Sequence, residues 1–240
     1  MKKLTSTLAA LALGALAFTQ TACRTTADTE KGFISLFDGK TLSGWQGVAD
    51  HWRVQDGALT GYTEKLNPLK NNTFLVWTNG TVDNFELRFR YRILGGNSGV
   101  QYRSTLIDPE KFIVGGYQAD FEAGKTYSGI LYEERGRGIL AERGQRTRVI
   151  EENGQTKVVK VGDLAASAEL QANIRHEDWN DYVILADGNH LMHFINGRMT
   201  IEVTDEQSAK AAKSGILALQ IHVGPPMVVQ FKDVRIKKLP

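Results

Sequence analysis

From residue 32 onward, apolar and polar side chains alternate in short runs that are separated by Gly, Asn and Asp residues. Alternation with a period of two is typical of a β-strand that buries one face. The clearest run is Phe85–Ile93, with apolar residues at odd positions and charged residues at even ones. We expect its charged face to be a solvated convex surface. Asp56-Gly57 and Asn196-Gly197 each join two runs, and both dipeptides favour tight hairpin turns.

Other runs have the same strand character, and helical signals are few. The additional strands include Trp52–Gln55, Asp181–Ala186 and His190–Ile195, whereas helix is expected only at Asp163–Gln171 and Asp205–Lys213. Roughly 210 residues lie from Gly32 onward, enough for one large core, and no repeat or linker divides them. The pattern predicts one all-β domain over residues 32–240, a two-sheet antiparallel sandwich of the jelly-roll type.

Aromatic residues and histidines carry further expectations about burial. Large aromatic side chains dominate cores, so we expect burial of the four tryptophans, Trp45, Trp52, Trp77 and Trp179. His176 and His193 are expected at the surface.

The first 22 residues have the pattern of a secretory signal peptide: Lys2 and Lys3 precede an apolar run, Leu8–Phe18. This run is shorter than the ~20 apolar residues that span a membrane. Cys23 is the only cysteine, which excludes an internal disulfide. Its position directly after the signal resembles a bacterial lipoprotein site, although Gln20 stands where such sites usually carry leucine.

We therefore expect lipidation of Cys23 and a flexible tether over residues 23–31. Arg24, by resemblance to Gram-negative lipoproteins, favours retention in the outer membrane. An exported lipoprotein of the cell envelope is the prediction, and an ordinary secreted protein with an incidental cysteine is the alternative.

Removal of the signal changes the charge of the chain. Lys2 and Lys3 are lost, so Lys plus Arg falls from 29 to equal the 27 Asp plus Glu. The mature chain is then formally neutral, which argues against nucleic acid as a partner because such binding needs a concentrated basic patch.

Candidate chemistry lies on the polar faces of several predicted strands. The residues that share these faces are Gln101 with Arg103, then Gln118 with Asp120 and Glu122, then Gln220 with His222. Tyr132 lies in a run, 129–135, whose alternation is less decisive. We expect these strands to line one concave sheet, with loops that carry Arg137 and Arg143 closing over it. Amides and guanidinium groups suit an oxygen-rich ligand.

Several motifs resemble one family in their order and spacing. They are Phe33–Trp45, Trp52–Leu59, Asn84–Leu87, Gly95–Arg103, Trp179–Tyr182, Phe194–Gly197, Leu219–His222 and Phe231–Lys237. The chain resembles the 3-keto-disaccharide hydrolase family, long catalogued as a domain of unknown function, over essentially all of 32–239. The resemblance implies a concanavalin-A-like jelly roll in an exported protein that acts on sugars already oxidised at C3. Gln118 departs from the family, in which many relatives carry Glu at this position.

The chemistry that the resemblance implies needs a base, an acid and an electrophile. A base removes the C2 proton beside the C3 ketone, the enolate expels the C1 oxygen, and water adds. His222 has the ordinary pKa of such a base, and Asp120 or Glu122 could be base or acid. Arg103 suits the enolate oxygen. The expected sugar-binding residues are Gln101, Gln118, Tyr132, Gln220, Arg137 and Arg143.

Other interpretations remain open. No cofactor is firmly indicated, and a divalent cation held by Asp120, Glu122 and His222 is an alternative electrophile. Each of these side chains could also be structural, as could Arg103 in an ion pair. An upstream sugar oxidoreductase would have to supply the 3-keto sugar.

The leading functional alternative is a non-catalytic, lectin-like carbohydrate-binding module, since jelly rolls often bind glycans without chemistry. An ordinary glycoside hydrolase is less favoured, because the Glu-x-Asp-x-x-Glu arrangement of laminarinase-like enzymes is absent.

Overall fold

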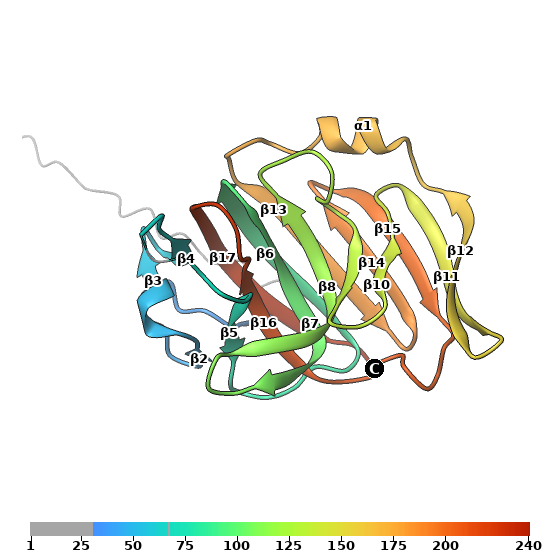
Figure 1. Cartoon of the computed structure of the whole chain (residues 1–240), viewed down its shortest axis with the longest axis horizontal. Helices are drawn as coiled ribbons and strands as arrows, with labels where there is room; N and C mark the ends of the chain where they lie inside the picture. Colours follow the sequence, from blue (N-terminus) through green and yellow to red (C-terminus); the bar gives the residue numbers. More distant parts are fainter. Residues whose placement is uncertain (1–30, 67) are drawn as a thin grey trace, which may run out of the picture.

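The alternating runs form the strands of two sheets that pack face to face (Figure 1). The computed structural model describes residues 31–66 and 68–240. Within these residues the larger sheet has ten strands. Their order is β12 (Gln155–Asp163), β11 (Gln145–Glu152), β15 (Arg198–Asp205), β14 (His190–Ile195), β13 (Asn180–Asp187), β6 (Phe85–Leu94), β17 (Met227–Lys238), β4 (Ala58–Thr63) and β3 (Trp52–Gln55), with β1 (Ile34–Ser35) beside β17.

The smaller sheet has seven strands in the described part of the chain. Their order is β10 (Gly138–Ala141), β9 (Leu131–Glu134), β8 (Ile113–Glu122), β7 (Asn97–Asp108), β16 (Ile216–Ile221), β5 (Thr73–Trp77) and β2 (Trp45–Gln46). The paired strands in both sheets are antiparallel except β11 and β15, which run parallel. The fold confirms the predicted all-β, two-sheet jelly roll.

The core lies between the two sheets. β6 buries its odd-numbered residues up to Ile93, as the alternation predicts. Its charged even-numbered residues, from 86 to 92, are half-buried rather than fully solvated. Tyr91 of the larger sheet stacks on Phe121 of the smaller one, with ring centroids 3.9 Å apart. Phe121 also lies 6.3 Å from Tyr182 of the larger sheet, where Tyr182 stacks on its neighbour Phe89 at 5.1 Å. Aromatic rings thus join the layers.

Both predicted hairpin turns are confirmed. Asp56 and Gly57 have φ values of 53° and 70°, and Asn196 and Gly197 have 48° and 77°. Such left-handed pairs match the twist of the flanking strands.

The helix predictions are only partly right. The predicted helix at 163–171 is the shorter α1 (Ser167–Ala172). The predicted helix at 205–213 is wrong, because this segment ends β15 and continues in turns. A three-residue 3-10 helix, η1 (Ala49–His51), precedes β3. No helix in residues 31–66 and 68–240 is long and apolar enough to cross a membrane.

Two burial predictions are also wrong. Trp179 is half-buried outside the core, with the Lys232 Nζ atom 3.9 Å from its ring. His193 is 0% exposed between two tyrosine hydroxyls, whereas His176 is exposed as expected. The other three tryptophans are buried as predicted: Trp45, Trp52 and Trp77.

A bend in β7 shapes the outer face of the smaller sheet. Arg103 has a φ of 47°, and the pairing of β7 with β8 shifts between Tyr102 and Thr105. Such a bulge bends the strand and changes the side-chain alternation. Beyond it the β7–β8 hairpin reaches β5, where the Phe74 N–H donates to the Phe112 carbonyl at 3.0 Å. Apolar residues fill this end of the outer face, namely Phe74, Val76, Val114 and Ala218.

The signal peptide over residues 1–22 and the lipidation of Cys23 lie outside the described residues. Both stay predictions.

Candidate functional site

The polar end of the outer face holds a groove with a cavity volume of about 420 Å³. Five of its lining residues are ones that the sequence predicts: Gln118, Asp120, Glu122, Tyr132 and His222. The others are Asn72, Asn97, Tyr127, Ile130, Glu134 and Ile139. Segments of β7, β8, β9 and β10, together with the ends of β5 and β16, therefore meet at one site.

β8 supplies the floor of the groove because its alternation is regular there. Tyr117, Ala119 and Phe121 are buried in the core between the sheets. The intervening Gln118 and Asp120 must then face away from the larger sheet. Both are nevertheless buried, and Asp120 is only 6% exposed. The outer face is therefore recessed at this point.

Asp120 is a buried carboxyl with two amide donors. Gln118 Nε2 donates to its Oδ1 at 2.6 Å, and Asn97 Nδ2 donates to its Oδ2 at 3.3 Å. Burial raises the pKa of Asp120 to about 7, with smaller contributions from the charges of Glu122 and Glu134, although the two amide hydrogen bonds oppose the shift. A carboxyl with this pKa can accept and return a proton near neutral pH.

A cluster of buried amides supports Asp120 from below. The side-chain amides of Gln101 and Gln118 meet at 2.8 Å, and the Gln220 amide lies 3.3 Å from that of Gln118. The Ser104 hydroxyl lies 2.6 Å from the Gln101 amide. All three glutamines are buried. Gln118 lines the groove. Gln101 lies beneath it, and its side chain is linked to the groove only by its hydrogen bond with Gln118.

Glu122 organises a loop rather than standing free in the groove. Its Oε1 accepts hydrogen bonds from the backbone N–H groups of Thr126 and Tyr127, at 2.5 and 2.9 Å. This interaction fixes Tyr127 at the rim, where it is 45% exposed. We interpret Glu122 as a positioning residue for the wall of the groove.

Arg143 holds the same loop from behind. Its guanidinium donates to the backbone carbonyls of Lys125, Thr126 and Ser128 in the loop and of Ser167 beside it. Its predicted place over the sugar is therefore wrong: backbone carbonyls occupy its donors, and it does not line the groove.

His222 lies at the opposite rim, directly after β16. Its ring is half-buried, and Nδ1 lies 2.5 Å from the Val223 carbonyl. Asn72 fixes this rim, since its Oδ1 accepts from the Val223 N–H at 2.8 Å and its Nδ2 donates to Glu134 Oε1 at 3.2 Å. The Nε2 atom of His222 is thus the ring nitrogen left to meet a ligand.

The prediction that Arg103 shares the face of Gln101 is wrong. The bulge turns its side chain away, and it is 2% exposed. The guanidinium donates to the backbone carbonyls of Asp83 and Gly188 at 2.6 Å each, and to Asn84 Oδ1 at 3.0 Å. A longer contact, at 3.4 Å, reaches the Ala212 carbonyl, so Arg103 joins three loops and does not reach the groove.

Arg137 is likewise structural. It donates to Glu133 Oε2 and to Asp205 Oδ2, both at 2.6 Å, and Asp205 also accepts from the Tyr117 hydroxyl. These four groups form a buried network on the core side of β9. The predicted contact of Arg137 with a sugar is wrong for this reason.

The sequence contained signals for some of the residues that its analysis missed. Asn97 stands four positions before Gln101 on β7, and Glu134 stands two positions after Tyr132 on β9, so the period of two places each pair on one strand face. Asn72 precedes β5 and reaches the groove only because β5 pairs with β16. No pattern in the sequence indicates that pairing.

No group of three or more His, Cys, Asp or Glu side chains within residues 31–66 and 68–240 is arranged to hold a metal ion.

Solved structures share this fold at low sequence identity. A candidate glycosyl hydrolase from Parabacteroides distasonis is 20% identical, with a TM-score of 0.56 over 87% of this chain and 94% of that chain. A Bacillus subtilis protein of unknown function with a galectin-like fold is 12% identical, with a TM-score of 0.54 over 82% and 90% of the two chains. A carbohydrate-binding module from the same species is 16% identical, with a TM-score of 0.51 over 81% and 96%. The class is thus a galectin-like jelly roll.

The family follows from the sequence. Residues 32–237 match the family described as the 3-keto-alpha-glucoside-1,2-lyase-like domain, and the chain belongs to this 3-keto-disaccharide hydrolase family. A 3-keto-disaccharide hydrolase from Bacteroides thetaiotaomicron is 32% identical over 83 residues. That match covers 30% of this chain and 27% of the relative. The family places the chain among carbohydrate-active, glycosyl-hydrolase-like proteins.

Proposed function

We propose that the protein cleaves 3-keto-glycosides, including 3-keto-disaccharides, by elimination and hydration. The observation that carries the proposal is Asp120, a recessed carboxyl with a pKa of about 7 at the floor of a polar groove. An oxygen-rich sugar suits the surrounding amides, and Tyr132 offers an aromatic ring.

The reaction proceeds in two stages. The C3 ketone acidifies the C2 hydrogen, and Asp120 takes this proton. The C2 electron pair then forms a C1=C2 double bond as the C1–O bond breaks. His222 donates a proton to the departing oxygen. When water adds at C1, it gives a proton back to His222, and Asp120 returns its stored proton to C2. The balance is hydrolysis of one glycosidic bond.

The negative charge at the C3 oxygen needs a donor other than Arg103. The Asn97 amide gives one N–H to Asp120 and keeps a second for this oxygen, whereas both N–H groups of Gln118 are taken by Asp120 and Gln220. A preorganised donor of this kind stabilises an oxyanion. A divalent cation is the alternative electrophile. Because no three carboxylate or imidazole side chains among the described residues are arranged to hold one, it would have to bind together with the sugar.

The first test is incubation of the purified protein with 3-keto-trehalose or trehalose, with and without EDTA, while released glucose is measured. We expect glucose from the keto sugar alone, because only the ketone acidifies C2. Loss of release in EDTA would assign the electrophile to a cation. Binding of the keto sugar without release would instead support the carbohydrate-binding function, and release from trehalose would contradict the elimination mechanism.

We further propose that the protein is exported and held in the cell envelope by lipid on Cys23, where an upstream sugar oxidoreductase supplies its substrate. Cells grown with labelled palmitate are expected to label the wild-type protein and not the Cys23→Ser variant. Label in both proteins, or in neither, would contradict the anchor.

A further inference from the structure

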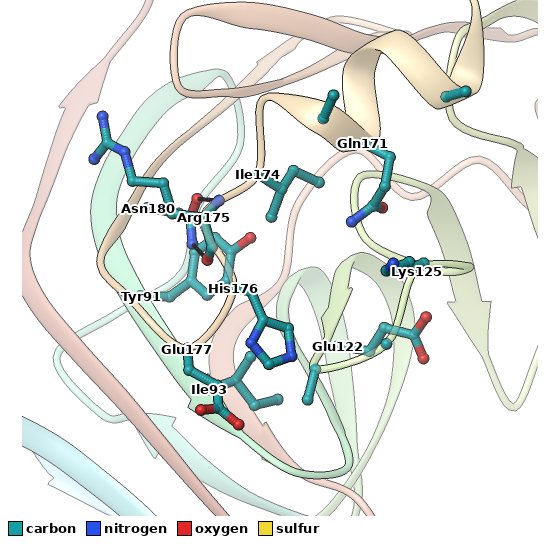
Figure 2. A pocket seen from close by; sticks show the side chains of 14 residues that line it. Tyr91, Ile93, Glu122, Lys125, Gln171, Ile174, Arg175, His176, Glu177 and Asn180 are labelled. Carbon is teal, nitrogen blue, oxygen red and sulfur yellow. Dashed lines mark hydrogen bonds between the residues drawn. The ribbon is translucent and has the colours of Figure 1, made fainter.

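A second cavity, of about 310 Å³, lies at one end of the sandwich. α1 and the segment that connects it to β13 form one side, and the loop after β8 forms another (Figure 1). Figure 2 shows Tyr91 and Asn180 on one side of this cavity and Gln171 and Lys125 on the other. The loop from 123 to 127 separates it from the groove, and Glu122 lines both.

Two buried polar atoms in its lining have no hydrogen-bond partner among the described residues. They are the hydroxyl of Tyr91, a residue that is 1% exposed, and Oε1 of Gln171. Buried polar atoms in folded proteins nearly always have a partner. Burial raises the pKa of Tyr91, so the phenol keeps its proton. The cavity therefore presents one hydroxyl, which can donate and accept, and one carbonyl oxygen, which can only accept.

The remaining lining restricts the chemistry of a ligand. Much of it is aliphatic: Ile93, Ala123, Ala168, Ala172 and Ile174. Lys125 and Arg175 are balanced by Glu122 and Glu177, so the formal charge has no excess of either sign. The Glu122 carboxylate is in addition occupied by two backbone N–H groups.

We propose that this cavity is a binding site for a neutral, polyhydroxylated ligand the size of one monosaccharide, separate from the groove. One ligand hydroxyl donates to Gln171 Oε1, a second exchanges a hydrogen bond with the Tyr91 hydroxyl, and the C–H face packs on the aliphatic wall. A carboxylate could not donate to Gln171. The inference stands independently of the proposed function, because no residue of the cleavage mechanism binds the ligand.

The test is titration of the whole ¹⁵N-labelled protein with methyl α-D-glucopyranoside and, separately, with cyclohexanecarboxylate, a ring of similar size that has a carboxylate and no hydroxyl to donate. We expect saturable shifts of the backbone amides of 123–125 and 168–172 with the neutral probe, and binding at least tenfold weaker for the charged one. Shifts confined to the groove, equal binding of both probes, or no saturable shift would overturn the proposal.

Two variants remove the proposed contacts one at a time. Tyr91→Phe and Gln171→Leu are each expected to weaken binding at least tenfold, whereas Gln155→Leu, at an exposed position of β12, leaves it unchanged. Tyr91→Phe removes a single oxygen without a protein partner, so its Tm should equal or exceed that of the wild type. Unchanged binding in both cavity variants would overturn the proposal. Asp120→Asn should leave this binding intact while it alters the groove, which separates the two sites.

Discussion

Replacement of Asp120 by asparagine is expected to lower kcat/KM for 3-keto-trehalose by a factor of ~10²–10⁴, the range that a positioned general base contributes. Asparagine keeps the size of the side chain and can still accept from Gln118, but it cannot take the C2 proton. The rate of glucose release by the variant and the wild type, measured at saturating and limiting keto sugar, checks this expectation.

The same variant should gain stability while it loses activity. Above pH 7 the wild-type protein holds a buried carboxylate, and the rise of its pKa from 3.8 to about 7 corresponds to a cost of about 4 kcal/mol at most. Asp120→Asn relieves this cost. Asp163→Asn, at an exposed position on the edge strand β12, is the charge-matched control and should change neither quantity. If Asp120→Asn lost both activity and stability, the residue would be structural rather than catalytic.

The contrast between Asp120 and Arg103 shows what side-chain alternation can predict. β8 is regular over Gln118, Asp120 and Glu122, so a period of two places them correctly on one face. β7 contains a bulge at Arg103, where the backbone has a left-handed φ. This one residue moves each later side chain of the strand to the opposite face of the sheet. Nothing in the local sequence marks the bulge, because arginine is not a residue that favours such a φ.

His193 shows the opposite case, in which the alternation was right and the expectation drawn from residue type was wrong. Leu191, His193 and Ile195 share one face of β14, and all three are buried. Residue type alone does not require this burial, because histidine is intermediate between the mostly buried and the mostly exposed residues. The tyrosines that satisfy its ring, Tyr102 and Tyr182, come from two different sheets, and the sequence does not reveal that meeting.

The groove was predictable as a set of strand faces but not as an enclosed space. Its floor follows from periodicity in β8. Its walls depend on long-range pairing, as with Asn72, and on backbone contacts, as with Arg143 behind the 123–128 loop. The three arginines expected at the sugar instead satisfy buried carbonyls and carboxylates, which is the common role of a buried guanidinium.

Between about pH 4 and 6.5, His193 and Asp120 make opposite contributions to the pH dependence of the free energy of unfolding. We expect these two contributions nearly to cancel in the wild-type protein. Burial lowers the pKa of His193 from 6.5 to about 3, so in this range the unfolded chain binds a proton that the folded protein does not. That linkage makes the free energy of unfolding rise with pH. Asp120, with its pKa raised to about 7, holds a proton only in the folded state, and its linkage makes the free energy fall.

Replacement of either residue by a side chain that does not titrate should therefore reveal the pH dependence that the other residue gives to the free energy of unfolding. Urea unfolding at pH values from 4.5 to 6 is expected to show the free energy of Asp120→Asn rising by about 1.4 kcal/mol per pH unit relative to wild type. That of His193→Gln should fall by about the same amount, since glutamine can bond both tyrosine hydroxyls without titrating. The remaining titratable groups are common to the three proteins and cancel in the comparison. If the free energy of unfolding had the same pH dependence in all three proteins, neither residue would be held in the protonation state that its burial requires. Asp120 would then not be a base with a pKa near neutral, and its assigned role would be wrong.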